Sequence, residues 1–368
     1  MPFPHRADHL GSFLRPRRLL DARGDPGVSP EGLRELEDQL IIDILRRQKD
    51  IGLQIFTDGE LRRRSFMSDF NESVSGLDNG DSVARSWQGA GAAGTNRVSP
   101  ISGIAVEKLQ QTKRLTVHES SFLRKQSPGD IKITLPSANQ FPAITWKKGV
   151  SEAAYPTPSD LLWDIVPMLA SEVEALVSEG VRYIQLDAPR YSYFLDPKWR
   201  AWLQSELGMN PGTALDEAIR ADNATLAATQ GTGVIAAIHL CRGNNRSQWY
   251  AEGGYDAIAE QLFGRLEVDV FLLEYDDERS GSFEPLRFVP RGKTVVLGLV
   301  SSKLAAMEKP DELVRRIEEA AKYVPLEHLA LSPQCGFAST MEGNLLSEDE
   351  QWRKLELVVE TARQVWGG

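Results

Sequence analysis

Both cysteines of the chain and one histidine come at the ends of apolar stretches. His239 and Cys241 end the stretch VIAAIHLC, Cys335 follows LALSPQ, and Glu274 ends the stretch VFLLE. Imidazole nitrogen, thiolate sulfur and carboxylate oxygen bind zinc, and a catalytic zinc site keeps one position open for substrate. The spacing therefore predicts a zinc site with His239, Cys241 and Cys335 as ligands and Glu274 as a candidate fourth.

Each of these residues also has an ordinary structural interpretation. A single cysteine commonly packs as a small buried hydrophobe, and a histidine after a strand commonly forms core hydrogen bonds. That interpretation must also explain why all three residues fall at predicted strand ends, so the set favours a metal. Closed structural zinc sites typically contain paired Cys-x-x-Cys motifs. The chain has no such motif, so we expect an open site.

Carboxylates follow two further apolar stretches. The segment FTDGE places Asp58 and Glu60 at a turn, and QLDAPR places Asp187 just before Pro189. We expect Glu60 and Asp187 to hold an amine or another cationic group of a substrate. The alternatives are a surface turn for Glu60, and a helix N-cap or an ion pair with Arg190 for Asp187.

A Gly-Ser turn lies near the start of the chain, in the segment DHLGSFLRP. Successive backbone N–H groups in such a turn can bind an anion. Gly11 and Ser12 are therefore candidates for binding a substrate carboxylate.

The elements that must position these residues alternate along the chain. Apolar periodicity and capping residues predict helices over 29–54, 159–180, 211–229, 254–263, 309–324 and 347–366. Strands are predicted over 55–60, 131–137, 181–187, 233–241, 268–277, 294–302 and within 326–336. Repeated strand–helix units predict a parallel sheet, and no Gly-rich phosphate turn supports a doubly wound sheet.

We therefore expect an α/β fold with a (β/α)8 TIM barrel that takes up residues 1–368 as a single catalytic domain. Polar residues stand at most of the predicted strand ends: Glu60, Ser137, Asp187, His239, Cys241, Glu274, Ser301 and Cys335. Residues around 75–130, rich in Gly and Ser at first, are predicted to form an irregular insertion or excursion. Within it, 101–109 and 114–123 are expected to pair as a small sheet.

Composition excludes several classes of function. The net charge of the 368 residues is −10, which argues against a nucleic-acid-binding protein. No segment approaches the length of apolar chain that a membrane span requires, and no signal-peptide pattern opens the sequence. We expect a cytoplasmic protein with reduced thiols and small-molecule partners. Self-association into a homo-oligomer is open, because no surface stripe indicates an interface.

The segments DHLGSFLRP, TDGELRRRSF, YIQLDAP, IHLCRGN, FLLEYDDERSG and LSPQCGF occur in this order. With them the chain resembles the cobalamin-independent methionine synthase family, and more closely single-barrel proteins similar to its C-terminal catalytic domain. The resemblance runs from about residue 7 to about residue 345. It implies methyl transfer to the thiol of homocysteine, from 5-methyltetrahydrofolate or another methyl donor, on a zinc held by His239, Cys241, Glu274 and Cys335.

The resemblance also implies substrate contacts. Gly11 and Ser12 would bind the amino acid's carboxylate, and Glu60 and Asp187 would hold its amine. Trp146 is similar in position to the family's folate-stacking tryptophan, and a core role is the alternative.

Two departures from the family pattern bear on the substrates. The family's histidine for proton transfer falls where this chain has Ser301 and Ser302. Arg242 and Arg246 follow the ligand motif and suggest an anionic group in the substrate.

Three alternative functions follow from different classes. The first is zinc-thiolate opening of an epoxide, as in epoxyalkane:coenzyme M transferase, whose thiol carries a sulfonate. The second is a metal-free barrel lyase similar to uroporphyrinogen decarboxylase, and the third is a zinc-stabilised protein that is not an enzyme. Only the first uses His239, Cys241 and Cys335 together in chemistry.

Overall fold

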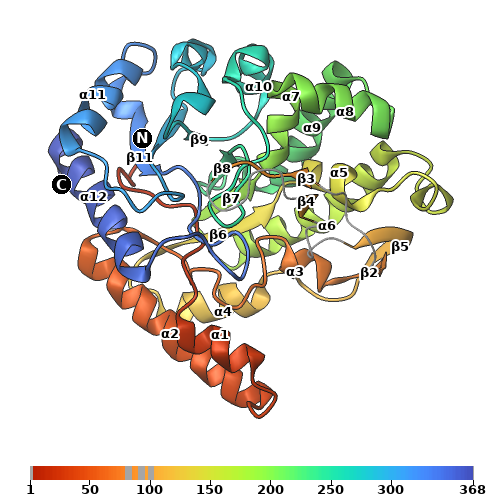
Figure 1. The fold of residues 1–368 in the computed structure, drawn as a ribbon, viewed down its shortest axis with the longest axis horizontal. Coiled ribbons are helices and arrows are strands. Elements are labelled where there is room, and N and C mark those ends of the chain that lie inside the picture. The colour runs from red at the N-terminus through yellow and green to blue at the C-terminus, as the bar shows by residue number, and fades with distance from the viewer. Residues whose placement is uncertain (1–2, 79–84, 90–95, 98–102, 368) are drawn as a thin grey trace.

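A computed structural model describes residues 3–78, 85–89, 96–97 and 103–367 of the chain. Seven parallel strands form one curled sheet in the order β1-β6-β7-β8-β9-β10-β11. Their bounds are Ile55–Phe56, Asp130–Pro136, Tyr183–Asp187, Ile235–Leu240, Val270–Glu274, Thr294–Val300 and Leu329–Pro333. Helices surround the strands, as Figure 1 shows, and the fold is thus an α/β fold with a parallel sheet.

Six of the helices in the described residues lie where the apolar periodicity predicts them. They are α1 (Arg17–Gly24), α2 (Pro30–Ile51), α3 (Ser68–Asn71), α4 (Val117–Gln126), α5 (Pro142–Thr145), α6 (Pro158–Ser178), α7 (Ser192–Leu195), α8 (Pro197–Leu207), α9 (Pro211–Leu226), α10 (Ala259–Arg265), α11 (Pro310–Ala320) and α12 (Glu348–Trp366). Helices α1, α3, α4, α5, α7 and α8 have no counterpart among the predicted helices.

Local chemistry explains where the long helices begin and end. Ser29 caps α2 by accepting a hydrogen bond from the backbone N–H of Gly32, and Gly52 ends the helix in the left-handed conformation. Such a cap satisfies one of the N–H groups that the first helical turn leaves without an internal partner. Capping boxes do the same at Thr157 for α6 and at Ser347 for α12.

The N-terminal segment lies between the two edge strands of the sheet. Ala7 forms a parallel bridge with Leu331 of β11, and Thr57, just after β1, donates its hydroxyl to the carbonyl of Gly11 at 2.7 Å. The arrangement is consistent with a TIM-like barrel. The predicted count of eight strands stays a prediction, because this segment forms a single bridge rather than a strand.

Between β1 and β6 the described residues form two antiparallel pairs outside the parallel sheet. Strand β2 (Val74–Asp78) pairs with β5 (Ile104–Gln111), and β3 (Arg85–Ser86) pairs with β4 (Asn96–Arg97). The expected pairing of 101–109 with 114–123 is wrong, because α4 occupies most of the second segment. Parts of the predicted 75–130 excursion lie outside the described residues, and its irregular character as a whole stays a prediction.

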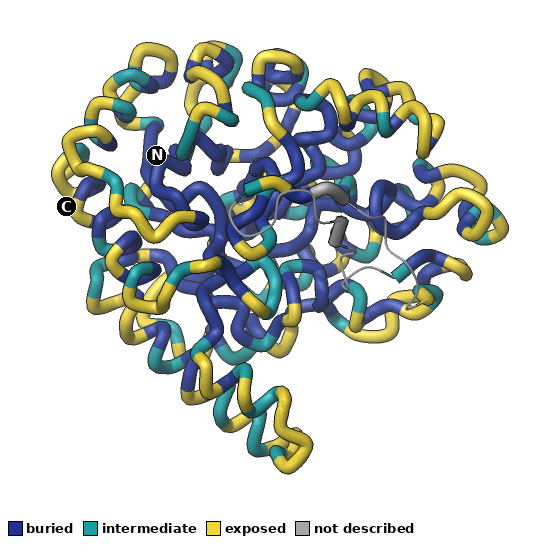
Figure 2. The backbone as a smooth tube through the Cα atoms, in the orientation of Figure 1, coloured by how far each residue is buried: buried dark blue, intermediate teal, exposed yellow. Residues whose placement is uncertain are grey.

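Buried apolar side chains form two clusters. The larger one packs the helices against the outer face of the sheet, and Figure 2 shows this burial as a dark interior within an exposed rim. The smaller cluster draws its members from the N-terminal segment and six strands: Phe3, Leu10, Ile55, Tyr183, Ala237, Val270, Leu272, Val296 and Ala330. Residues from so many strands can meet only because the sheet curls around them.

A buried ion pair also lies inside the curled sheet. The Lys132 ammonium donates to Asp8 Oδ1 at 2.6 Å, to the carbonyl of His9 at 2.7 Å and to Gln185 Oε1 at 3.1 Å. Tyr183 donates its hydroxyl to Asp8 Oδ2 at 2.8 Å. Because an ammonium has three donors, Lys132 is fully hydrogen-bonded, and the pair ties the N-terminal segment to β6 and β7.

Strand register brings polar residues together at the carboxyl edge. Asp187 is opposite His239, and Glu274 is opposite Gly298. A side chain at position 298 would put its Cβ 2.8 Å from the Gln334 Cα and from the Leu273 carbonyl oxygen. Glycine there lets the chain after β11 pass close to β10, which helps to bring Cys335 over the sheet edge.

Candidate metal centre

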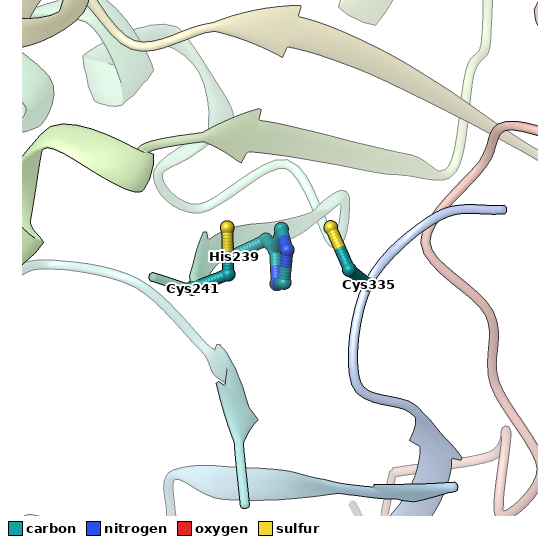
Figure 3. A group of neighbouring side chains, drawn as sticks. All are labelled: His239, Cys241 and Cys335. Atoms are coloured by element: carbon teal, nitrogen blue, oxygen red, sulfur yellow. The ribbon is translucent and has the colours of Figure 1, made fainter. Parts of the chain in front are cut away.

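His239, Cys241 and Cys335 converge at the carboxyl edge of the sheet. One ring nitrogen of His239 and the two Sγ atoms all lie within 4.8 Å of one another, and the three residues are buried. His239 belongs to β8 and Cys241 follows it by two residues, so both side chains leave the same face. Cys335 comes from the chain after β11, and Figure 3 shows it facing the other two side chains.

The two ring nitrogens of His239 have different surroundings. Nδ1 lies 3.3 Å from the carbonyl oxygen of Leu272, which can only accept, so Nδ1 is the protonated nitrogen. Nε2 is buried and has no oxygen or nitrogen partner among the described residues, and the ring forms a hydrogen bond with the Cys335 thiol. A carbonyl on Nδ1 that leaves a lone pair on Nε2 is the arrangement typical of a metal-ligating histidine.

The two thiols are coupled through a hydrogen bond. This bond with Cys241 lowers the pKa of Cys335 well below its usual range, and the same bond raises the pKa of Cys241. His239 and the Lys303 ammonium also lower the pKa of Cys335. Cys335 is therefore the thiol that ionises first, and a thiolate is the form that binds metals.

The structure does not bring Glu274 into this group of three. Its Oε2 accepts the backbone N–H of Arg242 at 2.7 Å, and its Oε1 lies 3.2 Å from Arg279 Nη2. Burial opposes ionisation of the carboxyl, but Arg242, Lys303 and Arg279 together lower its pKa. Glu274 is thus an ionised carboxylate whose partners are arginine side chains and a backbone N–H. It is not grouped with the nitrogen and the two sulfurs of His239, Cys241 and Cys335.

A cavity of about 400 Å³ opens over the three residues. Its wall includes these candidate ligands together with Ser12, Glu60, Trp87, Gln140, Asp187, Arg190, Arg246 and Tyr250. Ligand pockets typically combine apolar and aromatic walls with a few placed polar groups, and this cavity has both.

Glu60 and Asp187 both face the cavity. Glu60 Oε1 accepts the Thr134 hydroxyl at 2.8 Å and lies 3.7 Å from Arg63 Nη1, whereas its buried Oε2 has no partner among the described residues. Burial raises the pKa of Glu60, and it raises the pKa of Asp187 to about 7. Glu60 also has a φ of 55°, a strained conformation for a residue with a side chain. Such strain is characteristic of functional sites.

The Gly-Ser turn reaches the cavity through Ser12. Gly11 has a φ of 106°, and a Cβ at that position would lie 2.9 Å from Glu60 Oε1. Glycine is therefore required for the turn to approach Glu60. The Gly11 N–H points to His9 Nδ1 at 3.3 Å, so the cavity side of the turn is formed by Ser12.

The other sequence candidates lie elsewhere or at the rim. Arg242 is buried, donates Nη2 to the carbonyl of Gly253 at 2.6 Å and stacks on Tyr255, and it is not part of the cavity wall. Arg246 is exposed at the cavity. Trp146 donates Nε1 to the carbonyl of Tyr155 at 2.9 Å within the core and does not line the cavity.

Neither serine after β10 lines the cavity. Ser302 donates its hydroxyl to Gln334 Oε1 at 2.6 Å, and Ser301 Oγ accepts the backbone N–H of Lys303. The Lys303 ammonium, one residue further, donates to the carbonyl of Gly243 at 2.9 Å and to Asn244 Oδ1 at 3.1 Å. Lys303 thus fastens the loop that follows Cys241.

Sequence reasoning did not single out Trp87, Tyr250 or Lys303, and it considered Arg190 only as an ion-pair partner of Asp187. Arg190 and Lys303 each come three residues after a strand end, and that position was the available signal. Trp87 and Tyr250 carried none, because both belong to stretches without periodicity.

Within the described residues, no helix combines the length and the apolar character that a membrane span requires.

The family "Cobalamin-independent synthase, Catalytic domain" matches residues 15–364. The Bacillus subtilis (strain 168) protein YxjH, described as uncharacterized, is 38% identical over 99% of this chain and 95% of its own length.

Two crystal structures have a similar fold over nearly the whole chain. One is a Listeria monocytogenes protein provisionally identified as a vitamin-B12-independent methionine synthase, with a TM-score of 0.73 and 30% identity over 100% of both chains. The other is a B12-independent methionine synthase from Shewanella sp. W3-18-1 in complex with selenomethionine, with a TM-score of 0.75 and 22% identity over 98% of this chain and 97% of that one.

Proposed function

Because the chain belongs to the family of the cobalamin-independent synthase catalytic domain, we propose that it transfers a methyl or related alkyl group to a thiol. In this proposal His239, Cys241 and Cys335 bind a zinc ion. The observation that carries the proposal is the convergence of one imidazole nitrogen and two sulfurs within 4.8 Å at the base of a cavity.

The donor set fits zinc better than a hard cation. Two sulfurs and an imidazole suit zinc, whereas magnesium and calcium prefer oxygen ligands. The surroundings of the His239 ring support the fit, because Nδ1 bonds to the Leu272 carbonyl, Nε2 has no oxygen or nitrogen partner among the described residues, and the ring bonds to the Cys335 thiol, a second candidate ligand. Zinc held there would supply a substrate thiol in its thiolate form at neutral pH.

Homocysteine is the acceptor that the cavity wall favours. The free Oε2 of Glu60 and the carboxyl of Asp187 would hold its amine, and Ser12 would bind its carboxylate. The Shewanella structure holds selenomethionine, an amino acid of the same shape as the methylated product.

The chain's own residues would act by positioning. Glu60 and Asp187 fix the amino end, so that the acceptor's sulfur points toward the donor's methyl carbon, and holding reactants in line accounts for much of the acceleration in such displacements. The acceptor thiol loses its proton, and the sulfur's electron pair forms the new S–C bond. The leaving atom of the donor takes the pair of the bond that breaks and, overall, the proton that the thiol lost.

Opening of an epoxide by a sulfonate-bearing thiol is the second candidate. The exposed Arg246 at the cavity favours it, because a guanidinium can bind a sulfonate. Two acidic side chains at the same cavity oppose it, since they would repel that sulfonate.

The test compares two thiols in the zinc-loaded protein. Homocysteine and 2-mercaptoethanesulfonate are each assayed for alkylation with 5-methyltetrahydrofolate, other methyl donors and an epoxide, before and after chelation. Zinc-dependent methylation of homocysteine supports the proposal. A protein that binds no zinc, or one whose turnover is unchanged by chelation, contradicts it.

A further inference from the structure

Arg190 is a buried cation whose described partners are all neutral. It is 4% exposed and lines the cavity. Its Nη1 donates to the Tyr193 hydroxyl at 2.9 Å. With its amide oxygen turned toward the guanidinium, Gln140 accepts from Nε at 3.3 Å and from Nη2 at 3.2 Å.

Aromatic rings hold the guanidinium in place. Its central carbon lies 4.8 Å from the ring centroids of both Tyr193 and Tyr250. No carboxylate of the described residues lies within 4.0 Å of Arg190, in contrast to Arg63, which is buried against Glu119 and Asp69. A guanidinium has five N–H donors, and these neutral contacts use three of them.

Burial of an uncompensated charge is costly, so such a charge is normally paired. A cation left without a counter-ion on a cavity wall is therefore suited to an anion that comes with the ligand. Arginine is the residue that binds carboxylate, sulfonate and phosphate groups in bidentate fashion.

The wall around Arg190 is apolar and aromatic. Phe66, Met67, Trp87, Ile144 and Tyr250 all line the cavity. Trp87 and Tyr250 meet edge to face with ring centroids 5.2 Å apart and an interplanar angle of 80°. A flat or apolar group fits this wall, since aromatic faces bind such groups by stacking and burial.

The wall has its own residues, separate from those proposed to bind the thiol. The polar and ring contacts of Arg190 come from Gln140, Tyr193 and Tyr250. Ser12, Glu60 and the three candidate ligands make none of them. Arg242 cannot serve the cavity, because its guanidinium is bonded to the carbonyl of Gly253.

We propose that Arg190 binds an anionic group of the alkyl donor, whose flat or apolar part packs against Trp87 and Tyr250. This inference rests on the proposed function only for identifying the ligand as the alkyl donor. The anion site itself does not depend on turnover. The donor would be an anion that carries an apolar or aromatic body.

Binding of a small aromatic anion tests the site without turnover. Calorimetry compares 4-methylbenzoate with its neutral counterpart 4-methylbenzamide on the wild-type protein. The charged probe is expected to bind about 10- to 100-fold more tightly, which is the range for a hydrogen-bonded charge. Equal affinities for the two probes would overturn the proposal without any variant.

Variants identify the residue. Arg190→Gln is expected to remove the preference for the charged probe, and Arg190→Lys, which keeps the charge but not the planar fork, to retain part of it. Arg200→Gln changes an exposed arginine of α8 and serves as the matched control with wild-type affinity. If Arg190→Gln folds and still prefers 4-methylbenzoate, the site lies elsewhere.

Two further experiments follow. The first identifies which kind of anion binds at Arg190, and the second tests whether the anion and the thiol substrate bind at different places. Using 4-methylbenzenesulfonate and 4-methylphenyl phosphate in place of the benzoate shows which anion binds best, and each supports the site only if Arg190→Gln abolishes its binding. Saturating homocysteine should leave binding of the best probe intact. Competition would overturn the assignment to the donor. Probe binding through Arg190 without zinc-dependent thiol alkylation would contradict the proposed function alone.

Discussion

The interior of the curled sheet and the cavity at its carboxyl edge both bury charged groups, but they satisfy them differently. Inside the sheet, Lys132 makes three hydrogen bonds, and both oxygens of Asp8 have partners. At the cavity and among the described residues, Glu60 Oε2 is buried without a partner, His239 Nε2 has no oxygen or nitrogen partner, and Arg190 has no counter-ion. Fully satisfied polar groups stabilise a fold, whereas unsatisfied ones at a cavity indicate where a ligand binds.

The largest effect is expected at the candidate ligands. Cys241→Ser and Cys335→Ser should each lose zinc and lower thiol alkylation about a thousandfold or more, because the metal accounts for several kcal/mol of the barrier. Metal analysis and the homocysteine assay measure this. Far-ultraviolet circular dichroism should stay that of the wild type. A serine variant that keeps both zinc and turnover would place the chemistry elsewhere.

The second effect concerns the paired interior. Lys132→Met should lower the free energy of unfolding by about 3–5 kcal/mol, because it leaves the Asp8 carboxylate buried without its cation. Urea unfolding measures the change, and the double variant with Asp8→Asn should recover part of it. Zinc content of the folded fraction should be unaffected. A loss below about 1 kcal/mol would mean that the pair is not a stabilising unit.

The third effect contrasts Glu60, one of whose oxygens has no partner among the described residues, with a carboxylate whose two oxygens both have partners. Glu60→Gln should lower kcat/KM for homocysteine about 10- to 100-fold, the range for a lost charged hydrogen bond. Turnover of any thiol that lacks an amine should be spared. Its unfolding free energy should change less than that of a carboxylate paired through both oxygens, since Oε2 has no partner to lose and the amide oxygen can keep the Thr134 hydrogen bond.

The matched control is Glu172→Gln. Glu172 is buried and accepts hydrogen bonds from Arg114 and from the backbone of Leu115, so the same substitution should lower stability and leave turnover alone. If Glu60→Gln instead destabilises the protein as much as Glu172→Gln does, the contrast between the two kinds of carboxylate fails.

The fourth effect is a pH dependence of stability. Burial raises the pKa of Asp222 to about 7, although Ser137 and Tyr191 donate hydrogen bonds to it. The folded state then holds a proton that the unfolded state has lost above pH ~4, so stability falls as pH rises from about 4 to about 7. Asp222→Asn should flatten this slope by up to about 1.4 kcal/mol per pH unit in urea titrations. If the slope of stability against pH is the same in Asp222→Asn as in the wild type, other carboxyl groups cause the pH dependence.

Much of the fold could be predicted because its signals are local. The period of apolar residues and the caps at Ser29 and Ser347 located the long helices within a few residues. The pairing partner of β5 could not be predicted, because strand pairing depends on contacts distant in sequence. Helix α8 was missed as well: its first residues, Asp196 and Pro197, form a cap and an N1 proline that sequence reasoning did not use.

By itself the sequence determined which residues end the strands, and so which side chains share the carboxyl edge: His239, Cys241 and Cys335 among them. Parallel strands make that inference safe, because all their carboxyl ends meet at one edge. Only the tertiary structure decided the direction of each side chain. Glu274 turns to the backbone N–H of Arg242, and the Arg242 side chain turns to the carbonyl of Gly253, since these polar partners satisfy them there. Arg190 lines the cavity, and Trp146 bonds within the core instead.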